Sequence, residues 1–345
     1  MQKLNKEITI YDIAKLLKLS SATVSRALKD NPVISPSTRI SVQETASKLG
    51  YRRNNYASNL REQKSYTIGI LLHELQSNFI KNVLSGIEKV TYEAGYHLLI
   101  AHSNENFEKE KNNALNLFNK RVDGLITSLS FNTERLDHFK PFQEKGIPVI
   151  FFDRVEENSA GTKIIIDNYK CGQIVTQHLI DQGCKKIALV TASLNRNVYH
   201  QRYNGYKDTL ESNNIQVKKE YVLIKDLSEA SGIEAANEIL QLNPMPDGIF
   251  ITNDFSAAVC MQILKDRGIR IPEDIAIVGF NNDAITTIVK PQLTTINYPG
   301  YEIGQVAAQK IISHLEGVTD ILASNVVVNA NLIIRKSSLR KQKEF

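Results

Sequence analysis

The feature that most constrains the fold is a regular alternation of short β-rich runs with amphipathic helical stretches, which begins after Tyr66. The strand-like runs are TIGILL, YHLLIAH, VDGLITSL, PVIFFD, KKIALVTA, GIFITND and DIAIVGF. Alternation of this kind predicts parallel sheets that are joined by right-handed crossovers. About a dozen units in two sets are typical of an α/β core with two doubly wound lobes.

The first 64 residues differ from this core in charge. They contain 12 Lys+Arg and 5 Asp+Glu, a net charge of +7, whereas the whole chain of 345 residues carries only +5. The remaining 281 residues therefore carry −2. This asymmetry indicates a small domain that meets a polyanion, attached to a larger body that does not.

Within the basic segment, apolar periodicity predicts three short helices, over residues 10–17, 22–29 and 36–49. The expected capping residues are Thr9, then Ser20 or Ser21, then Ser35, which precedes a proline. Ile40, Ala46 and Leu49 are expected to form the apolar stripe of the third helix. Three short helices with a tight turn between the first two describe an all-α helix-turn-helix headpiece.

The outward positions of the second helix are small or carry hydroxyls, with one forked cation. We predict that Ser21, Ala22 and Arg26 contact base edges in a major groove, and that Tyr11, Thr23 and Ser25 contact phosphates, with Lys29 on the same surface. Short side chains allow close approach, and arginine can bond both acceptors of a guanine edge. A polar solvent-facing surface is the alternative, which the charge asymmetry disfavours.

Polar pairs follow three of the expected strands: Asp153-Arg154, Asn253-Asp254 and Asn281-Asn282. Each pair could be a strand-end turn. In open α/β sheets, however, ligands bind beyond the carboxyl ends of the strands, so the recurrence favours a shared cleft.

Several function classes find no support. The chain has no Walker motif, no GxGxxG, no HxxxH and no HExxH, which disfavours a nucleotide cofactor, a metal or an enzyme. Cys171, Cys184 and Cys260 lack CxxC spacing and are expected to be buried thiols. No apolar run approaches 18 residues, and the charged, amphipathic start lacks a secretory core, so we expect a cytoplasmic protein without a membrane span.

The chain resembles the bacterial transcription-factor family of the lac and purine repressors. The resemblance is carried by TIYDIAKLLKLSSATVSRALKD, ISPSTRISVQETASKLGY, NNYASNLREQKSYTIGILL, KRVDGLITS, IPVIFFDR, IDNYKCG, GIFITNDFSA, IPEDIAIVGFNN and LTTINYP. It implies a helix-turn-helix headpiece and a two-lobed core like that of periplasmic binding proteins. The implied divisions are a headpiece at 1–53, a hinge at 54–65, an N-terminal lobe at 66–166 with 298–327, and a C-terminal lobe at 167–297 with 328–345.

The resemblance also implies how the hinge meets DNA. In the family, this segment folds into a helix on operator DNA and inserts a leucine into the minor groove, which matches Leu60, with Ala57 as the small residue beside it. The chain departs from the family pattern at Lys18, where glycine is usual and a left-handed backbone would cost lysine roughly 1 kcal/mol. Arg52-Arg53 replaces the usual proline that opens the hinge.

For a small-molecule effector, the resemblance implies a set of contacts in the cleft. The matching residues are Phe79, Arg154, Asp167, Arg196, Arg202, Asn253 and Asn281. Asn281 replaces the more common aspartate, which removes a purely accepting carboxylate. The substitution disfavours a purine or cationic effector and is compatible with a sugar or a sugar acid.

We therefore expect a ligand-responsive repressor of carbohydrate-related genes that binds a palindromic operator as a homodimer. A coiled-coil tetramerisation tail is not expected, because KSSLRKQKEF at the end of the chain lacks heptads. The alternatives are a solute-binding protein, which the basic headpiece and the charged start disfavour, and an enzyme on the same scaffold.

Overall fold

The computed structural model describes residues 7–52, 64–156, 159, 161–318 and 325–340. The chain forms two compact units, Met1–Ser65 and Tyr66–Phe345. Among the described residues, no helix is both long enough and apolar enough to cross a membrane.

Among its described residues, the first unit contains three helices: α1 (Ile10–Leu17), α2 (Ser21–Ala27) and α3 (Pro36–Lys48). Its small core consists of Ile13, Ala14, Val24, Ala27, Val42 and Ala46. The stripe predicted for α3 is partly wrong, because Ile40 is 56% exposed. Ala46 faces the core as predicted, and Val42 takes the place expected for Ile40, since residues four apart lie on one face of a helix.

Side chains cap each of these helices. The Asp12 carboxylate accepts hydrogen bonds from the N–H of Thr9 (2.8 Å) and from its hydroxyl (2.7 Å). Ser20, one of the two predicted caps of α2, accepts from the Thr23 N–H at 3.0 Å. Lys18 ends α1 with φ 56° and ψ 37°, so the left-handed conformation considered from the sequence is present.

The second unit contains two sheets. In the described residues, the first has the order β11 (Asn325–Val327), β5 (Thr162–Ile165), β4 (Val149–Phe152), β3 (Gly124–Thr127), β1 (Thr67–Leu72), β2 (His97–His102). The second has the order β12 (Asn331–Ile333), β10 (Thr294–Asn297), β9 (Ala276–Asn281), β8 (Gly248–Ile251), β6 (Ile187–Thr191), β7 (Val222–Ile224). Neighbouring strands are parallel, as predicted, except that edge strand β12 runs antiparallel to β10.

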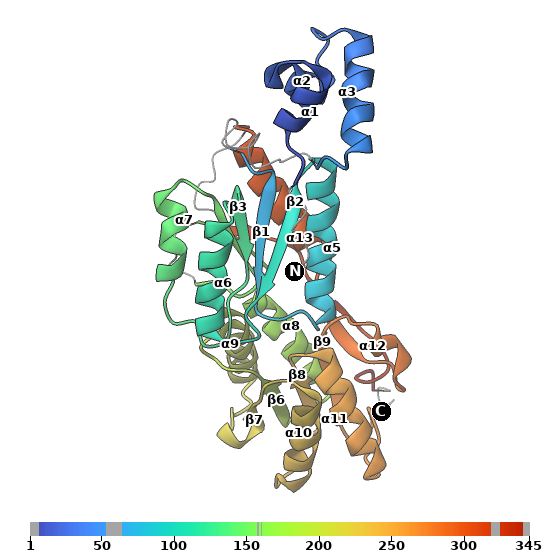
Figure 1. The fold of residues 1–345 in the computed structure, drawn as a ribbon. Helices are drawn as coiled ribbons and strands as arrows, with labels where there is room; N and C mark the ends of the chain where they lie inside the picture. Colours follow the sequence, from blue (N-terminus) through green and yellow to red (C-terminus); the bar gives the residue numbers. More distant parts are fainter. Residues whose placement is uncertain (1–6, 53–63, 157–158, 160, 319–324, 341–345) are drawn as a thin grey trace, which may run out of the picture. The chain divides into compact units, whose positions relative to one another are not determined.

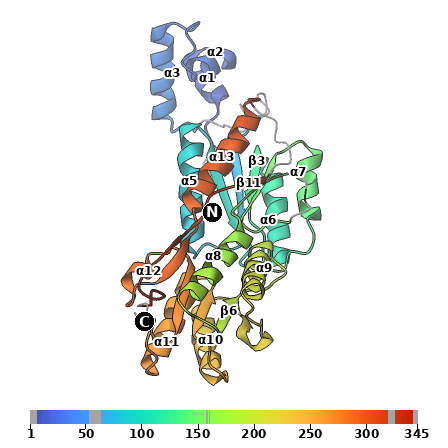
Figure 2. The same cartoon turned by 180° about the vertical axis from the view of Figure 1, so that it is seen from behind.

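Helices cover both sheets (Figures 1 and 2). Lobe 1, built on the first sheet, includes α5 (Asn78–Glu93), α6 (Phe107–Asn119), η1 (Asp137–Phe139), α7 (Lys140–Glu144) and α13 (Gly300–Leu315). Lobe 2, built on the second, includes α8 (Asn168–Asp181), α9 (Asn197–Ser212), η2 (Lys219–Tyr221), α10 (Glu229–Gln241), α11 (Asp254–Asp266) and α12 (Ile285–Ile288). The chain passes between the lobes after β5, after β10 and after β11.

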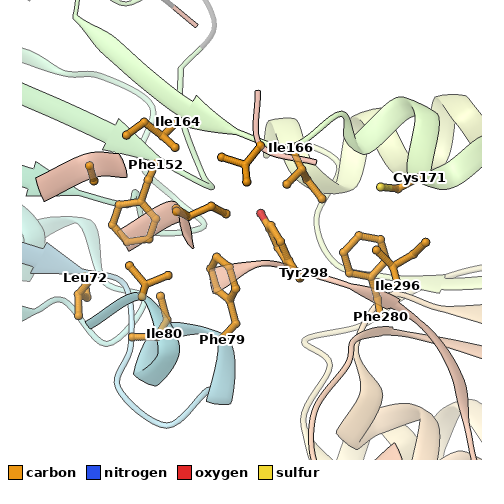
Figure 3. Packing of buried hydrophobic residues seen from close by; sticks show 14 of the residues in the cluster. Leu72, Phe79, Ile80, Phe152, Ile164, Ile166, Cys171, Phe280, Ile296 and Tyr298 are labelled. Carbon is orange, nitrogen blue, oxygen red and sulfur yellow. The ribbon is translucent and has the colours of Figure 1, made fainter. Parts of the chain in front are cut away.

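The core is continuous where these crossings lie (Figure 3). The Tyr298 ring stacks on Phe79 of α5, with ring centroids 4.1 Å apart, and meets the edge of Phe280 from β9 at 5.6 Å. Tyr298 therefore joins the apolar interiors of the two lobes.

The segment after Arg335 packs into lobe 2. Ser337 is fully buried: its hydroxyl donates to the Ile277 carbonyl at 2.6 Å and accepts from the Thr294 N–H at 2.9 Å. Arg340 donates to the carbonyls of Pro272 and Asp247 at 2.8 and 2.6 Å. Residues 335–340 thus form part of the second lobe's structure.

Candidate functional site

The outer face of α2 collects the residues that the sequence assigned to DNA. Ala22 and Arg26 are exposed, as is Lys29 in the turn after α2, whereas Val24 and Ala27 on the opposite face of the helix are buried. Ser21, Thr23 and Ser25 are half-buried at the sides of the helix, and Tyr11 of α1 is 70% exposed. A helix that presents small side chains and one forked cation can approach base edges closely.

The two hinge residues assigned to the minor groove, Ala57 and Leu60, lie outside the described residues. Their roles remain predictions from the resemblance.

A cluster of charged side chains lies between the lobes, beyond the carboxyl ends of the strands. We call Glu105, Asp153, Arg154, Arg196 and Arg202 the interlobe cluster. Arg154 follows β4 and is almost fully buried. Its guanidinium donates to the Glu105 carboxylate at 2.6 Å, donates to the Tyr199 hydroxyl of lobe 2 at 3.2 Å and stacks on the Phe131 ring at 4.0 Å.

Arg202 of α9 is also buried, but within the described part of the chain its hydrogen-bond acceptors include no carboxylate. Its Nε donates to Asn168 Oδ1 at 2.9 Å, and its Nη1 lies 3.4 Å from the Thr252 carbonyl. The guanidinium carbon sits 3.6 Å from the centre of the Phe280 ring. Stacking on an aromatic face is a favourable environment for a desolvated arginine.

Arg196 precedes α9 and is 5% exposed. Its Nη2 donates to the Thr133 carbonyl of lobe 1 at 2.6 Å, but its buried Nε and Nη1 have no hydrogen-bond partner. Burial lowers the pKa of this guanidinium from its usual value. It is therefore a buried cation whose hydrogen-bonding capacity is largely unused.

Burial also shifts the pKa of acidic groups near the lobe boundary. It raises the pKa of Asp153, whose carboxylate accepts from the Tyr298 hydroxyl. It raises the pKa of Asp254 to about 7 and that of Asp283 to about 6. His73 has its pKa held well below the usual value by burial and by Arg154. Desolvation disfavours the charged form in each case.

Four other predicted effector residues have structural roles already. Phe79 stacks on Tyr298, and Asn281 ends β9 with φ 123°. Asp167 is exposed and caps α8 by accepting from the Lys170 N–H at 2.8 Å. Asn253 caps α11 through the Ser256 N–H at 3.0 Å. A ligand that binds Asp167 or Asn253 would therefore contact a side chain that also caps a helix.

Sequence reasoning missed the partners that join the lobes. Asn197 accepts from the Val155 N–H and donates to the Asp153 carbonyl, both at 3.0 Å, which ties α9 to the end of β4. Thr133 and Tyr199 were missed as well. Each contact joins residues more than 40 positions apart, so no local pattern could have identified them.

The described residues contain no group of three His, Cys, Asp or Glu side chains that could hold a metal ion. Cys171, Cys184 and Cys260 are buried and free, as predicted. Burial raises the pKa of each thiol to about 12, which makes these cysteines poor nucleophiles.

Comparison with known proteins agrees with this geometry. Residues 9–54 match the bacterial regulatory proteins of the lacI family, and residues 176–338 match a periplasmic binding protein-like domain. Catabolite control protein A of Priestia megaterium is 33% identical over 313 residues, which cover 90% of this chain and 94% of that protein.

Two solved structures share the fold. The lac repressor dimer bound to operator and the anti-inducer ONPF superposes with a TM-score of 0.85 at 24% identity, covering 97% of this chain and all of that one. The complex of the transcriptional regulator CelR with cellobiose has a TM-score of 0.72 at 24% identity, covering 96% of this chain and all of that one.

A helix-turn-helix unit in one chain with a two-lobed α/β body defines a class of protein, the DNA-binding regulators of transcription. The chain belongs to the lacI family of bacterial regulatory proteins. The resemblance and fold class predicted from the sequence are thereby confirmed.

Proposed function

We propose that this regulator represses carbohydrate-related genes by binding a palindromic operator, and that a small-molecule effector between the lobes modulates its affinity. The observation that carries the proposal is the outer face of α2 and the turn that follows it, where Ala22, Arg26 and Lys29 are exposed within the basic end of the chain. We assign base contacts to Ser21, Ala22 and Arg26.

Phosphate contacts fix the register of a recognition helix on DNA. We assign these contacts to Tyr11, Thr23, Ser25 and Lys29. Ala57 and Leu60 would enter the minor groove, where unstacking one base step costs a few kcal/mol and the bend permits further contacts.

The effector would bind between the lobes, within reach of Phe79, Arg154, Asp167, Arg196, Arg202, Asn253 and Asn281. CelR, which shares this fold, was solved with cellobiose, which supports a carbohydrate or a derivative of one. The proposed divisions are 66–166 with 298–327 for one lobe and 167–297 with 328–345 for the other, linked to the headpiece (1–53) by residues 54–65. An effector that favours one lobe arrangement would change operator affinity about 5- to 150-fold, the usual range for allosteric coupling.

A homodimer follows from the same proposal, because a two-fold symmetric protein matches a palindrome. The lac repressor that shares this fold was solved as a dimer on its operator. Edge strand β2 exposes Leu99 and Ile100, and Tyr92 and Leu115 are exposed on α5 and α6 of the same lobe. We propose these apolar side chains as part of the self-association surface. Because its target is DNA, we place the protein in the cytoplasm.

Operator selection from random duplexes tests the proposal. The wild-type protein should enrich a palindrome, and Arg26→Ala should weaken binding to it by about 1–3 kcal/mol, the range for a lost base contact. Lys48→Ala at the end of α3 is the matched control, because it removes one exposed positive charge away from α2. If no duplex is enriched while a sugar binds the body, a solute-binding function replaces this proposal.

A further inference from the structure

We propose that the effector carries a negative charge, a carboxylate or a phosphate, and that Arg196 is the residue that neutralises it. This inference rests on the proposed function, because it specifies the chemical class of the ligand that the interlobe cluster receives.

The first observation is the state of the Arg196 guanidinium. Only its Nη2 has a hydrogen-bond acceptor, the Thr133 carbonyl at 2.6 Å. The Nε and Nη1 atoms carry three N–H donors between them, and both are buried without a partner. Buried polar groups are almost always hydrogen-bonded, and buried charges are usually paired. The unpaired N–H groups of Arg196 can therefore donate hydrogen bonds to an acceptor on a bound ligand.

The second observation is how the neighbouring carboxylates are used. Glu105 is paired with Arg154. Glu110 accepts from the Ser130 N–H at 2.7 Å, from the Thr133 hydroxyl at 3.0 Å and from His138 Nε2 at 2.9 Å. In the described part of the chain, neither carboxylate forms an ion pair with Arg196. Burial lowers the pKa of Arg196, and the acid that opposes this most is Glu156, which is exposed and forms no ion pair with the guanidinium among the described contacts. In the described residues, the buried charge of Arg196 is therefore not balanced by an ion-paired carboxylate.

Arg202 strengthens this imbalance. Its acceptors are an amide oxygen and a carbonyl, both uncharged. Asp153 is the acid beside it in the cluster, but burial raises the pKa of Asp153 and its carboxylate accepts from the Tyr298 hydroxyl. Among the described residues, these three buried guanidinium groups thus have one ion-paired carboxylate, Glu105, and it pairs with Arg154.

These facts separate the possible ligands. Water or a neutral sugar hydroxyl can accept hydrogen bonds from the unused N–H groups, but neither neutralises the positive charge of Arg196. A carboxylate or phosphate does both, and hydrogen bonds between ionised groups are shorter and stronger than neutral ones. Arg196 belongs to lobe 2 and is hydrogen-bonded to Thr133 of lobe 1. An anion bound to Arg196 would therefore also change the contact between the two lobes.

Thermal unfolding of the full-length protein tests the proposal in two steps. In sodium chloride alone, Arg196→Gln should unfold at the same or a higher temperature than wild type. Glutamine removes the uncompensated charge but keeps an N–H donor for the Thr133 carbonyl. Arg196→Lys keeps the charge and should bring no such gain. A lower unfolding temperature for Arg196→Gln than for both other proteins would overturn the proposal, since the guanidinium would then be a structural requirement.

In the second step, inorganic phosphate and glucuronate are titrated at constant ionic strength, with glucose as the neutral partner of glucuronate. Both anions should raise the wild-type unfolding temperature saturably, with glucuronate binding roughly ten- to hundredfold tighter than glucose. Arg196→Gln should lose this response, and the exposed control Arg267→Gln should keep it. Equal responses to glucuronate and glucose, or equal anion responses in wild type and Arg196→Gln, would contradict the proposal.

Operator selection by the ligand-free protein is measured separately, so failure of the charge assignment is distinguishable from failure of the regulator function.

Discussion

The two lobes share their architecture but differ in how they treat charge where they meet. In each lobe two helices pack in close contact, α5 with α13 and α8 with α9. Each pair depends on a glycine: a Cβ at Gly86 would lie 2.1 Å from the Tyr301 carbonyl oxygen, and one at Gly205 would lie 2.1 Å from that of Tyr169. Lobe 1, however, gives its buried Arg154 a carboxylate partner, whereas Arg196 of lobe 2 forms no ion pair in the described residues. The shared packing supports the fold, and the difference in charge marks the site.

The largest effect is expected from substitutions that test whether the two helix pairs pack in the same way. Gly86→Ala and Gly205→Ala should each lower the free energy of unfolding by about 2–3 kcal/mol, because the new methyl group overlaps backbone that cannot move easily. Urea unfolding measures both. Ser85→Ala, at an exposed position of α5, is the control and should have little effect. A tolerated alanine in one lobe only would show that the two helix pairs are not equivalent.

A smaller effect depends on pH and should come mainly from lobe 2. Folding raises the pKa of Asp254 to about 7 and that of Asp283 to about 6. At pH values between the unfolded pKa and the folded pKa of each carboxyl, the folded state therefore binds more protons than the unfolded state. Stability should therefore fall as pH rises from about 4 to 7, by about 2 kcal/mol. Chemical unfolding at a series of pH values measures this slope. Asp254→Asn should flatten it, and an unchanged slope in that variant would refute the assignment.

The next prediction concerns the charge difference itself. Glu105→Gln should leave Arg154 without a carboxylate, as Arg196 is in the wild type. We expect a loss of about 1–2 kcal/mol in stability, less than for a fully buried pair because the Glu105 side chain is 28% exposed. Arg196→Gln should cause no comparable loss. Equal losses in the two variants would mean that the lobes do not differ in charge compensation.

The sequence predicted the regular parts of the molecule well. The run 10–17 became α1 with those same bounds, and TIGILL became β1, because strong periodicity and burial determine both. Five strands of the described residues were missed. Strands β7, β11 and β12 have three residues each and lie at sheet edges, and β5 and β10 have four residues each, which leaves almost no pattern. The face of α3 was misassigned because Ile40 and Val42 compete for the core and only packing decides between them.

The site was less predictable than the fold. Arg154, Arg196 and Arg202 were named through the resemblance, but no pattern in the sequence distinguishes the paired arginine from the unpaired one. That distinction depends on Glu105, which lies 49 residues from Arg154. It also depends on Glu110, whose carboxylate accepts hydrogen bonds from other residues, such as Ser130. Contacts between distant residues decide which charge stays uncompensated.

We propose that one chain links operator binding to occupancy of the interlobe cluster. The most direct test is the dissociation constant for the selected operator, measured with and without a saturating ligand, for wild type and Arg196→Gln. We expect a ligand-induced change of about 5- to 150-fold in the wild type and a loss of that response in the variant. An operator affinity that no bound ligand alters in the wild type, or that the ligand alters equally in Arg196→Gln, would contradict it.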